Sequence, residues 1–194
     1  GEAHSEIIED QLAGTNDARL VIEPSGRNTA PAIGLAAALL LPEAVMLVCP
    51  SDHHISDAQA FRKAALAAAE LARDDRLVSF GIQPDSPETG YGYLERGKAL
   101  PGGFEIARFV EKPSLELAKE YLLSGKFSWN GGIFAFRAGY LLDEMATHRP
   151  AMADLVRQAV AKGREDQSRF YPNAEAFDAI DGESIDYAIM ENTK

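Results

Sequence analysis

The chain has 194 residues, 46% of them hydrophobic, which is enough for one well-buried core. Its 19 Lys and Arg against 30 Asp and Glu give a formal net charge of −11, which argues against non-specific nucleic-acid binding. No apolar run reaches the roughly 18 residues that a membrane span needs. The first eleven residues lack the basic and apolar regions of a signal peptide, and the single cysteine, Cys49, fits a reducing compartment. We therefore expect a cytoplasmic protein that binds neither nucleic acid nor membrane.

The first half of the chain alternates strand and helix patterns. Residues 19–22 form a short β-like run, and residues 31–41 are almost all Ala, Leu and Ile, which predicts a buried helix capped by Asn28 or Thr29. Residues 44–49 predict a strand covered on both faces. Apolar residues then recur at helical spacing between residues 57 and 73, and residues 77–80 return to a β pattern.

The second half continues this alternation. Residues 104–110 and 133–136 predict strands, and Ser114 is expected to cap a helix that runs through Leu123 and ends at Gly125. Residues 141–147 and 152–161 predict helices, residues 163–167 a polar stretch, and residues 185–190 a short helix capped by Ser184. Nothing divides the chain into two domains. The pattern predicts an α/β fold whose mixed, mostly parallel sheet is flanked by helices, with ligands beyond the carboxyl ends of the strands.

Two groups of polar residues follow predicted strands in the first half. In the run from Glu23 to Pro31, the start of a helix offers N–H donors and Arg27 offers a planar fork for an anion or a base, although a capped turn with a solvated Arg explains it equally. Asp52 follows the apolar strand, where a carboxylate suits Mg²⁺ that bridges phosphate oxygens. The adjacent His53 and His54 lack partners at zinc spacing, so we expect them to pack or to form hydrogen bonds.

Two further groups lie in the second half. The glycines of Gly90-Tyr91-Gly92 allow close approach of a ligand to the backbone, or equally a hairpin turn. Glu111 beside Lys112 offers acceptors to sugar hydroxyls and a cation to a phosphate, and Asn130 adds an amide, although a surface ion pair and a turn are the alternative. No nucleophile triad and no GxxxxGK[ST] loop is present.

Six segments in this order resemble the bacterial mannose-1-phosphate guanylyltransferases of the sugar nucleotidyltransferase family. They are EPSGRNTAPAI, LVCPSDHHI, FGIQPDSPETGYGYL, FVEKP, WNGGIFAF and SIDYAIME, and they span nearly the whole chain. The resemblance implies a Rossmann-like sheet flanked by helices. It also implies the attack of mannose 1-phosphate on the α-phosphorus of GTP, which yields GDP-mannose and pyrophosphate for polysaccharide biosynthesis.

The resemblance also implies roles for individual residues. Asp52 would bind Mg²⁺ and, with Lys112, serve the catalytic step. The guanosine side would be lined by Glu23, Arg27, Asn28 and Thr29. Mannose and its phosphate would be held by Gly92, Glu111, Lys112 and Asn130, with Asp186 supporting the sugar pocket.

The sequence departs from the family pattern in two places. The Gly-rich GxGTRLWPLSR loop and the GWSDVGSW-like stretch do not occur in it, so residues 1–194 are expected to be the central part of one nucleotidyltransferase domain, incomplete at both ends. We expect little pyrophosphate release by these residues alone. The alternatives are transfer of another hexose or nucleotide, or a non-catalytic sugar-nucleotide-binding module; a homo-oligomer is possible in either case.

Overall fold

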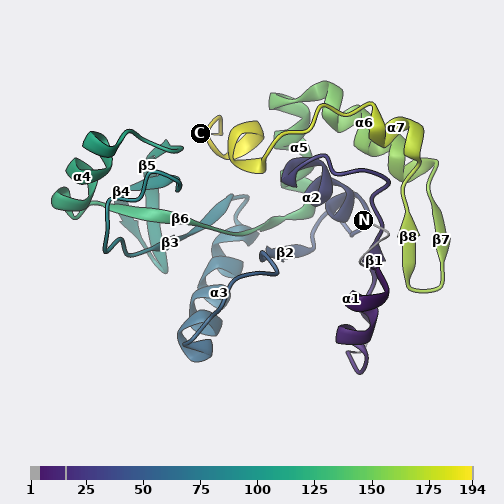
Figure 1. The fold of residues 1–194 in the computed structure, drawn as a ribbon, viewed down its shortest axis with the longest axis horizontal. Coiled ribbons are helices and arrows are strands. Elements are labelled where there is room, and N and C mark those ends of the chain that lie inside the picture. Colours follow the sequence, from purple (N-terminus) through teal and green to yellow (C-terminus); the bar gives the residue numbers. More distant parts are fainter. Residues whose placement is uncertain (1–4, 16, 194) are drawn as a thin grey trace. The chain divides into compact units, whose positions relative to one another are not determined.

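The computed structural model describes residues 5–15 and 17–193 (Figure 1). The chain gathers into two compact units. Unit 1 comprises Gly1–Pro42 and Leu141–Lys194, and unit 2 comprises Glu43–Tyr140. We describe each unit by itself.

Unit 2 contains five strands and two helices in its described residues. In chain order these are β2 (Val45–Val48), α3 (Ala58–Arg73), β3 (Val78–Ile82), β4 (Tyr93–Leu100), β5 (Gly103–Val110), α4 (Leu115–Ser124) and β6 (Phe127–Arg137). The long strand β6 organises the sheet. It pairs with β3 along one edge, and with β4 and β2 at successive positions along the other.

The strand directions correct the expectation of a mostly parallel sheet. The α/β architecture with helices against a sheet is confirmed, but β6 runs antiparallel to β2, β3 and β4, and β4 pairs antiparallel with β5. Because β2 and β3 both oppose β6, they run in the same direction, as a strand–helix–strand pattern predicts. They do not pair with each other, since β6 lies between them.

Local signals in the sequence define both helices of unit 2. The Asp57 side chain accepts from the N–H groups of Gln59 and Ala60 and so caps α3. The Ser114 hydroxyl accepts from the Leu117 N–H, and Gly125 ends α4 in the left-handed region at φ 64°. Each helix buries one apolar face against the sheet. One core cluster contains Ala68, Ala72 and Ala135, and the other contains Tyr93, Ala118, Tyr121 and Phe127.

Unit 1 is mainly helical. Its described elements are α1 (Ser5–Leu12), β1 (Leu20–Val21), α2 (Thr29–Ala38), α5 (Ala138–His148, which begins at the end of unit 2), α6 (Pro150–Ala161), β7 (Arg164–Asp166), β8 (Arg169–Tyr171), α7 (Ala174–Asp178) and the π-helix η2 (Asp186–Met190). The buried helix predicted from residue 31 onward is α2, and it packs against α6, since a Cβ on Gly34 would lie 3.5 Å from Val156 Cγ2. In a three-stranded sheet, β8 pairs with β1 in parallel and with β7 in an antiparallel hairpin.

Some local expectations were wrong. The polar stretch at residues 163–167, for which no element was predicted, contains strand β7, which forms a hairpin with β8. Leu47 in β2 is 43% exposed, so this strand is not covered on both faces. The Ser184 hydroxyl does accept from the Tyr187 N–H, but the helix that follows is a π-helix, in which the Glu191 N–H reaches back five residues to the Asp186 carbonyl. In the part of the chain that the structure describes, no helix is long and apolar enough to cross a membrane.

Candidate functional site

Three of the residues predicted to bind sugar and phosphate meet at one point of unit 2. Gly92, directly before β4, is buried, and a Cβ placed on it would overlap Glu111 Oε2. The same Cβ would lie 3.3 Å from Asn130 Cβ. The missing side chain of Gly92 therefore leaves room for the Glu111 carboxylate beside Asn130, which favours the close-approach interpretation of this glycine over a simple turn.

Main-chain hydrogen bonds hold these segments together. The Asn130 N–H donates to the Gly92 carbonyl at 2.7 Å, and the Lys112 N–H donates to the Tyr91 carbonyl at 3.2 Å. Lys112 has a φ of 45°, an uncommon value for a residue with a side chain. The two bonds link the start of β4 to the end of β5 and to Asn130 within β6, so the position of Gly92 relative to Glu111 and Asn130 is set by the sheet.

Glu111 and Lys112 form an ion pair, which the sequence analysis gave as the alternative to sugar and phosphate binding. Lys112 Nζ lies 3.1 Å from Glu111 Oε1, with the lysine side chain 56% exposed and the glutamate side chain 11% exposed. The acceptor is thus mostly enclosed while the cation reaches solvent. Because the lysine end of the pair is exposed, the pair contributes little to stability, about 0–1 kcal/mol.

An aromatic pair lies beside this cluster. The rings of Tyr91 and Trp129 meet edge to face with their centroids 5.2 Å apart. Trp129 Nε1 is buried and has no hydrogen-bond partner among the described residues. Trp129 precedes Asn130 on β6, and its ring also packs against the cluster formed by Tyr93, Ala118, Tyr121 and Phe127.

Asp52 lies in an exposed turn that follows β2. Pro50, two residues earlier, lies next to Gly132, because a Cβ on Gly132 would be 3.7 Å from Pro50 Cγ. The turn therefore follows a residue that lies beside the middle of β6, two residues from Asn130 in the strand. Among the described residues, no group of three or more His, Cys, Asp or Glu side chains could hold a metal ion. A single carboxylate completed by phosphate oxygens and water fits Mg²⁺, whereas zinc needs more protein ligands.

The neighbours of Asp52 are exposed. His53 and His54 therefore do not pack in a core, and their expected hydrogen bonding stays a prediction. Cys49 is exposed as well. The common reason is that the chain leaves the sheet after Val48, the last residue of β2.

In unit 1 the segment that contains Arg27 contacts the end of α7. Arg27 donates to the Asp178 carbonyl at 2.6 Å and pairs with the Asp178 carboxylate at 3.8 Å, and Ser25 donates to the same carboxylate. Arg27 Nε is buried without a described partner. The interpretation of Arg27 as a merely solvated side chain is therefore wrong. Asp178 was not predicted, because no local pattern links it to a segment about 150 residues earlier.

Glu23 is a second half-buried polar group of this segment. Its Oε1 atom is buried and has no hydrogen-bond partner among the described residues. Burial disfavours the charged form and raises the pKa of the Glu23 carboxyl above its ordinary value. An unsatisfied acceptor of this kind costs about 1–3 kcal/mol, and a ligand with an N–H donor would offset that cost.

The start of α2 corrects one part of the sequence argument. The Thr29 N–H donates to Asn28 Oδ1, the Ala30 N–H donates to the Glu183 carbonyl, and Pro31 has no N–H. The protein itself thus satisfies the donors that the sequence offered to an anion. Asn28 has a φ of 69°, and the Thr29 hydroxyl accepts from the Ile185 N–H at 2.9 Å.

The hydrogen bond from the Ile185 N–H holds Thr29 against residue 185, and Asp186 is the next residue of the chain. Arg149 holds this segment through two hydrogen bonds of 2.7 Å to the Glu183 carboxylate. The pKa of Glu183 is lowered mainly by these bonds, and the pKa of Arg149 is raised by them. The residues assigned to the guanosine side and Asp186 therefore share one region of unit 1. The residues assigned to mannose and its phosphate, other than Asp186, share one region of unit 2.

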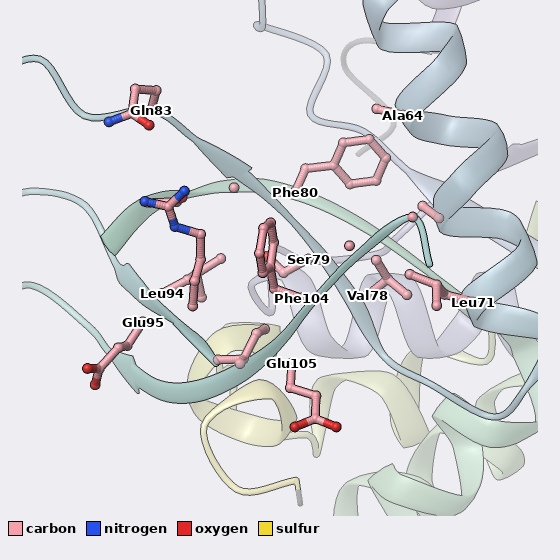
Figure 2. Close-up of a pocket in the computed structure, with 17 residues that line it drawn as sticks. Ala64, Leu71, Val78, Ser79, Phe80, Gln83, Leu94, Glu95, Phe104 and Glu105 are labelled. Atoms are coloured by element: carbon pink, nitrogen blue, oxygen red, sulfur yellow. The ribbon is translucent and has the colours of Figure 1, made fainter. Parts of the chain in front are cut away.

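A separate cavity of about 370 Å³ lies in unit 2 between α3, β3, β4, β5 and β6 (Figure 2). Its wall combines apolar side chains such as Leu71, Phe80 and Phe104 with polar ones such as Glu95 and Arg96, and none of the predicted site residues lines it. Ser79 lines this cavity and also contacts the predicted site, since its hydroxyl donates to Asn130 Oδ1 at 2.8 Å. Sequence reasoning missed Ser79, which looks like an ordinary residue of a strand.

Comparison with known proteins gives a consistent result. The family model described as nucleotidyl transferase matches residues 1–174. The chain is 45% identical over 204 aligned residues to the mannose-1-phosphate guanylyltransferase of Escherichia coli K12, covering 99% of this chain and 43% of the relative. It is 43% identical over 197 aligned residues to the xanthan biosynthesis protein XanB of Xanthomonas campestris strain B100, covering 99% of this chain and 42% of that protein.

A solved structure agrees over the full length of the chain. The crystal structure of mannose-6-phosphate isomerase from Helicobacter pylori superposes with a TM-score of 0.91 and 32% identity, covering all of this chain and 77% of that one. The chain spans less than half the length of the curated relatives it matches. The family model nevertheless covers most of its residues, and the chain belongs to the nucleotidyl transferase family.

Proposed function

We propose that this chain supplies the sugar-phosphate and guanosine contacts of a mannose-1-phosphate guanylyltransferase, which forms GDP-mannose and pyrophosphate from GTP and mannose 1-phosphate. The observation that carries the proposal is the meeting of Gly92, Glu111 and Asn130. It combines an enclosed acceptor for hydroxyl groups, an amide, and space for a close approach to the backbone. The mannose-1-phosphate guanylyltransferases of Escherichia coli and Salmonella typhimurium, each 45% identical to the chain, support the choice of substrates.

The reaction needs no nucleophile from the protein. A phosphate oxygen of mannose 1-phosphate forms a bond to the α-phosphorus of GTP while the bond to the bridging oxygen of the β-phosphate breaks, and pyrophosphate leaves with that electron pair. Lys112 would place a positive charge beside the sugar phosphate, and Glu111 would accept hydrogen bonds from mannose hydroxyls. Asn130 and Gly92 would orient the sugar.

The guanosine side would use the segment from Glu23 to Thr29. Glu23 carries a buried oxygen that lacks a described partner, and guanine offers N–H donors of matching kind. Arg27 is held by Asp178, so its planar group is fixed in place. Asp186 lies in the same unit and is linked to Thr29 through the bond to Ile185, but the role that the resemblance gives it is support of the sugar pocket.

Asp52 would hold Mg²⁺ through its exposed carboxylate, together with phosphate oxygens and water. When bound, Mg²⁺ would neutralise the charge that gathers on the phosphates during transfer. This contribution would matter in a chain whose formal net charge is −11.

Ligand binding tests the proposal directly on this chain. Calorimetric titration with mannose 1-phosphate, glucose 1-phosphate, GTP and ATP should show that mannose 1-phosphate and GTP bind more tightly than the two competitors. An equal response to all four would point to a nucleotidyltransferase of different specificity, and no response to any would overturn the proposal.

Turnover is best tested in a chimeric protein. In it, this chain replaces the segment of the Escherichia coli K12 relative that it matches, and pyrophosphate release is measured with GTP and mannose 1-phosphate. The exchanged protein should be active, and the same protein with Asp52→Asn should lose most of its activity while it keeps the circular dichroism spectrum of a folded chain. A folded but inactive exchange protein would contradict the proposed function.

A further inference from the structure

The Asn130 side chain is held in one orientation by two donors. The Ser79 hydroxyl donates to Asn130 Oδ1 at 2.8 Å, and the Gly132 N–H donates to the same atom at 3.3 Å. A backbone N–H can only donate, so the amide atom that faces Gly132 has to be the oxygen. The hydrogen-bond pattern thereby fixes which end of the amide faces β3 and which faces away from it.

Both of these donors come from regular features of unit 2. Ser79 lies on β3, and the ladder between β3 and β6 shifts register between Ser79 and Gly81, opposite Asn130. The Gly132 N–H points back to the side chain two residues earlier, and Gly132 itself has a φ of 63°, which glycine adopts without strain. An oxygen with two lone pairs that accepts two hydrogen bonds is saturated. The other polar atom of the amide is Nδ2, which can only donate, so any side-chain contact that Asn130 adds to a ligand, beside the contacts it makes within the protein, is a donated hydrogen bond.

We propose that Ser79 is a positioning residue that holds Asn130 Oδ1 inside the protein, so that Asn130 acts on the sugar phosphate only as a hydrogen-bond donor. The inference rests on the proposed function for the identity of the ligand, mannose 1-phosphate. The atom that Asn130 recognises is an acceptor oxygen of this ligand, on its phosphate or on a hydroxyl. Acceptor contacts to mannose hydroxyls are left to Glu111, so donor and acceptor roles are divided between the two sides of Gly92.

The position of Ser79 makes a matched pair of variants practical. Ser79 lines the cavity of about 370 Å³ (Figure 2), so one added methyl group has space there. Ser79→Thr keeps the hydroxyl, and Ser79→Val has a methyl group in its place, so the two variants have almost the same shape as each other. Both are β-branched residues, which are favoured in strands. Loss of one hydrogen bond should weaken mannose 1-phosphate binding by roughly 3- to 10-fold in Ser79→Val and leave Ser79→Thr near the unmodified chain.

The positioning of Asn130 by Ser79 is tested first without ligand. In a ¹⁵N-labelled chain, the side-chain NH₂ resonances of Asn130 should move or broaden in Ser79→Val and stay in place in Ser79→Thr. Unchanged resonances in Ser79→Val would overturn the positioning role. GTP affinity should be equal in both variants, because GTP is proposed to bind at residues of unit 1, and a loss in Ser79→Val alone would show that the substitution acts through general damage.

The donor role is tested with ligand. Mannose 1-phosphate should shift the Asn130 NH₂ resonances, and Asn130→Asp, which keeps an oxygen for Ser79 and Gly132 but replaces the donor, should weaken binding by at least about 10-fold. Methyl α-mannoside separates the two sources of the acceptor, because it shifts the same resonances only if that oxygen belongs to a hydroxyl. If mannose 1-phosphate shifted the backbone resonances of Gly92 and Glu111 but not the side-chain NH₂ resonances of Asn130, the donor role would be overturned. No shift at any of these residues would overturn the proposed function, while the result on the ligand-free chain would still decide the positioning role.

Discussion

Substitution of Gly92 by alanine is the sharpest test of the sugar-phosphate cluster. The new Cβ would overlap Glu111 Oε2 and lie 3.3 Å from Asn130 Cβ and 3.4 Å from Phe109 Cζ. The last two distances are tight and need shifts of at most a few tenths of an ångström, whereas the overlap with the carboxylate requires the Glu111 side chain to move. The φ of Gly92 lies outside the left-handed region, and an alanine therefore adds no backbone strain.

The two expected effects differ in size. Glu111 can rotate away through its flexible side chain, so the free energy of unfolding should fall by only about 1 kcal/mol, at the low end of overpacking costs. A displaced carboxylate can no longer accept from mannose, and hydrogen bonds to charged groups contribute about 1.5–3 kcal/mol. Mannose 1-phosphate affinity should therefore fall by roughly 10- to 100-fold.

Calorimetry with mannose 1-phosphate measures the affinity, and urea unfolding measures the stability. Gly90→Ala is the matched control, because a Cβ on Gly90 meets nothing within 4 Å and its φ also lies outside the left-handed region. This control should leave both quantities unchanged. If Gly92→Ala bound mannose 1-phosphate as tightly as Gly90→Ala, the assignment of Glu111 to the sugar would be refuted.

Three other outcomes follow from single contacts. Glu183→Gln should lower the free energy of unfolding by about 1 kcal/mol, because it weakens the partly exposed pair with Arg149. The folded-state pKa of Glu183 is lowered, so the pair stabilises the fold above the ordinary carboxyl pKa, and the difference between variant and unmodified chain in urea unfolding should shrink as the pH falls below about 4. Gly125→Ala should cost about 1 kcal/mol, read from thermal unfolding, because φ is 64° there although a Cβ has open space; no loss would contradict the αL cap. Asp52→Asn should leave the unfolding midpoint unchanged, because Asp52 is exposed, and should lower the Mg²⁺-dependent gain in GTP affinity by about 10-fold in calorimetry; an unaltered Mg²⁺ effect would remove Asp52 from the metal site.

The sequence by itself determined those elements whose signals are local. Ser114 and Gly125 mark the two ends of α4 through a side-chain cap and a left-handed residue, and both depend only on neighbours within a turn of helix. The apolar run from residue 31 likewise predicted the buried helix α2. The family could be identified for a similar reason, since short motifs in a fixed order can be read without knowledge of their positions in space.

Only the tertiary structure decided which residues meet. The insertion of β6 between β2 and β3 is a long-range pairing, and it reverses the sheet polarity that strand–helix alternation suggests. The contact of Ser79 with Asn130 spans 51 residues, and that of Arg27 with Asp178 spans 151, so neither has a local signal. The sequence offered free N–H groups at the start of α2, but the Glu183 carbonyl takes one of them from far along the chain. Hydrogen-bond donors and acceptors can be counted from a sequence, whereas their partners are known only once the chain has folded.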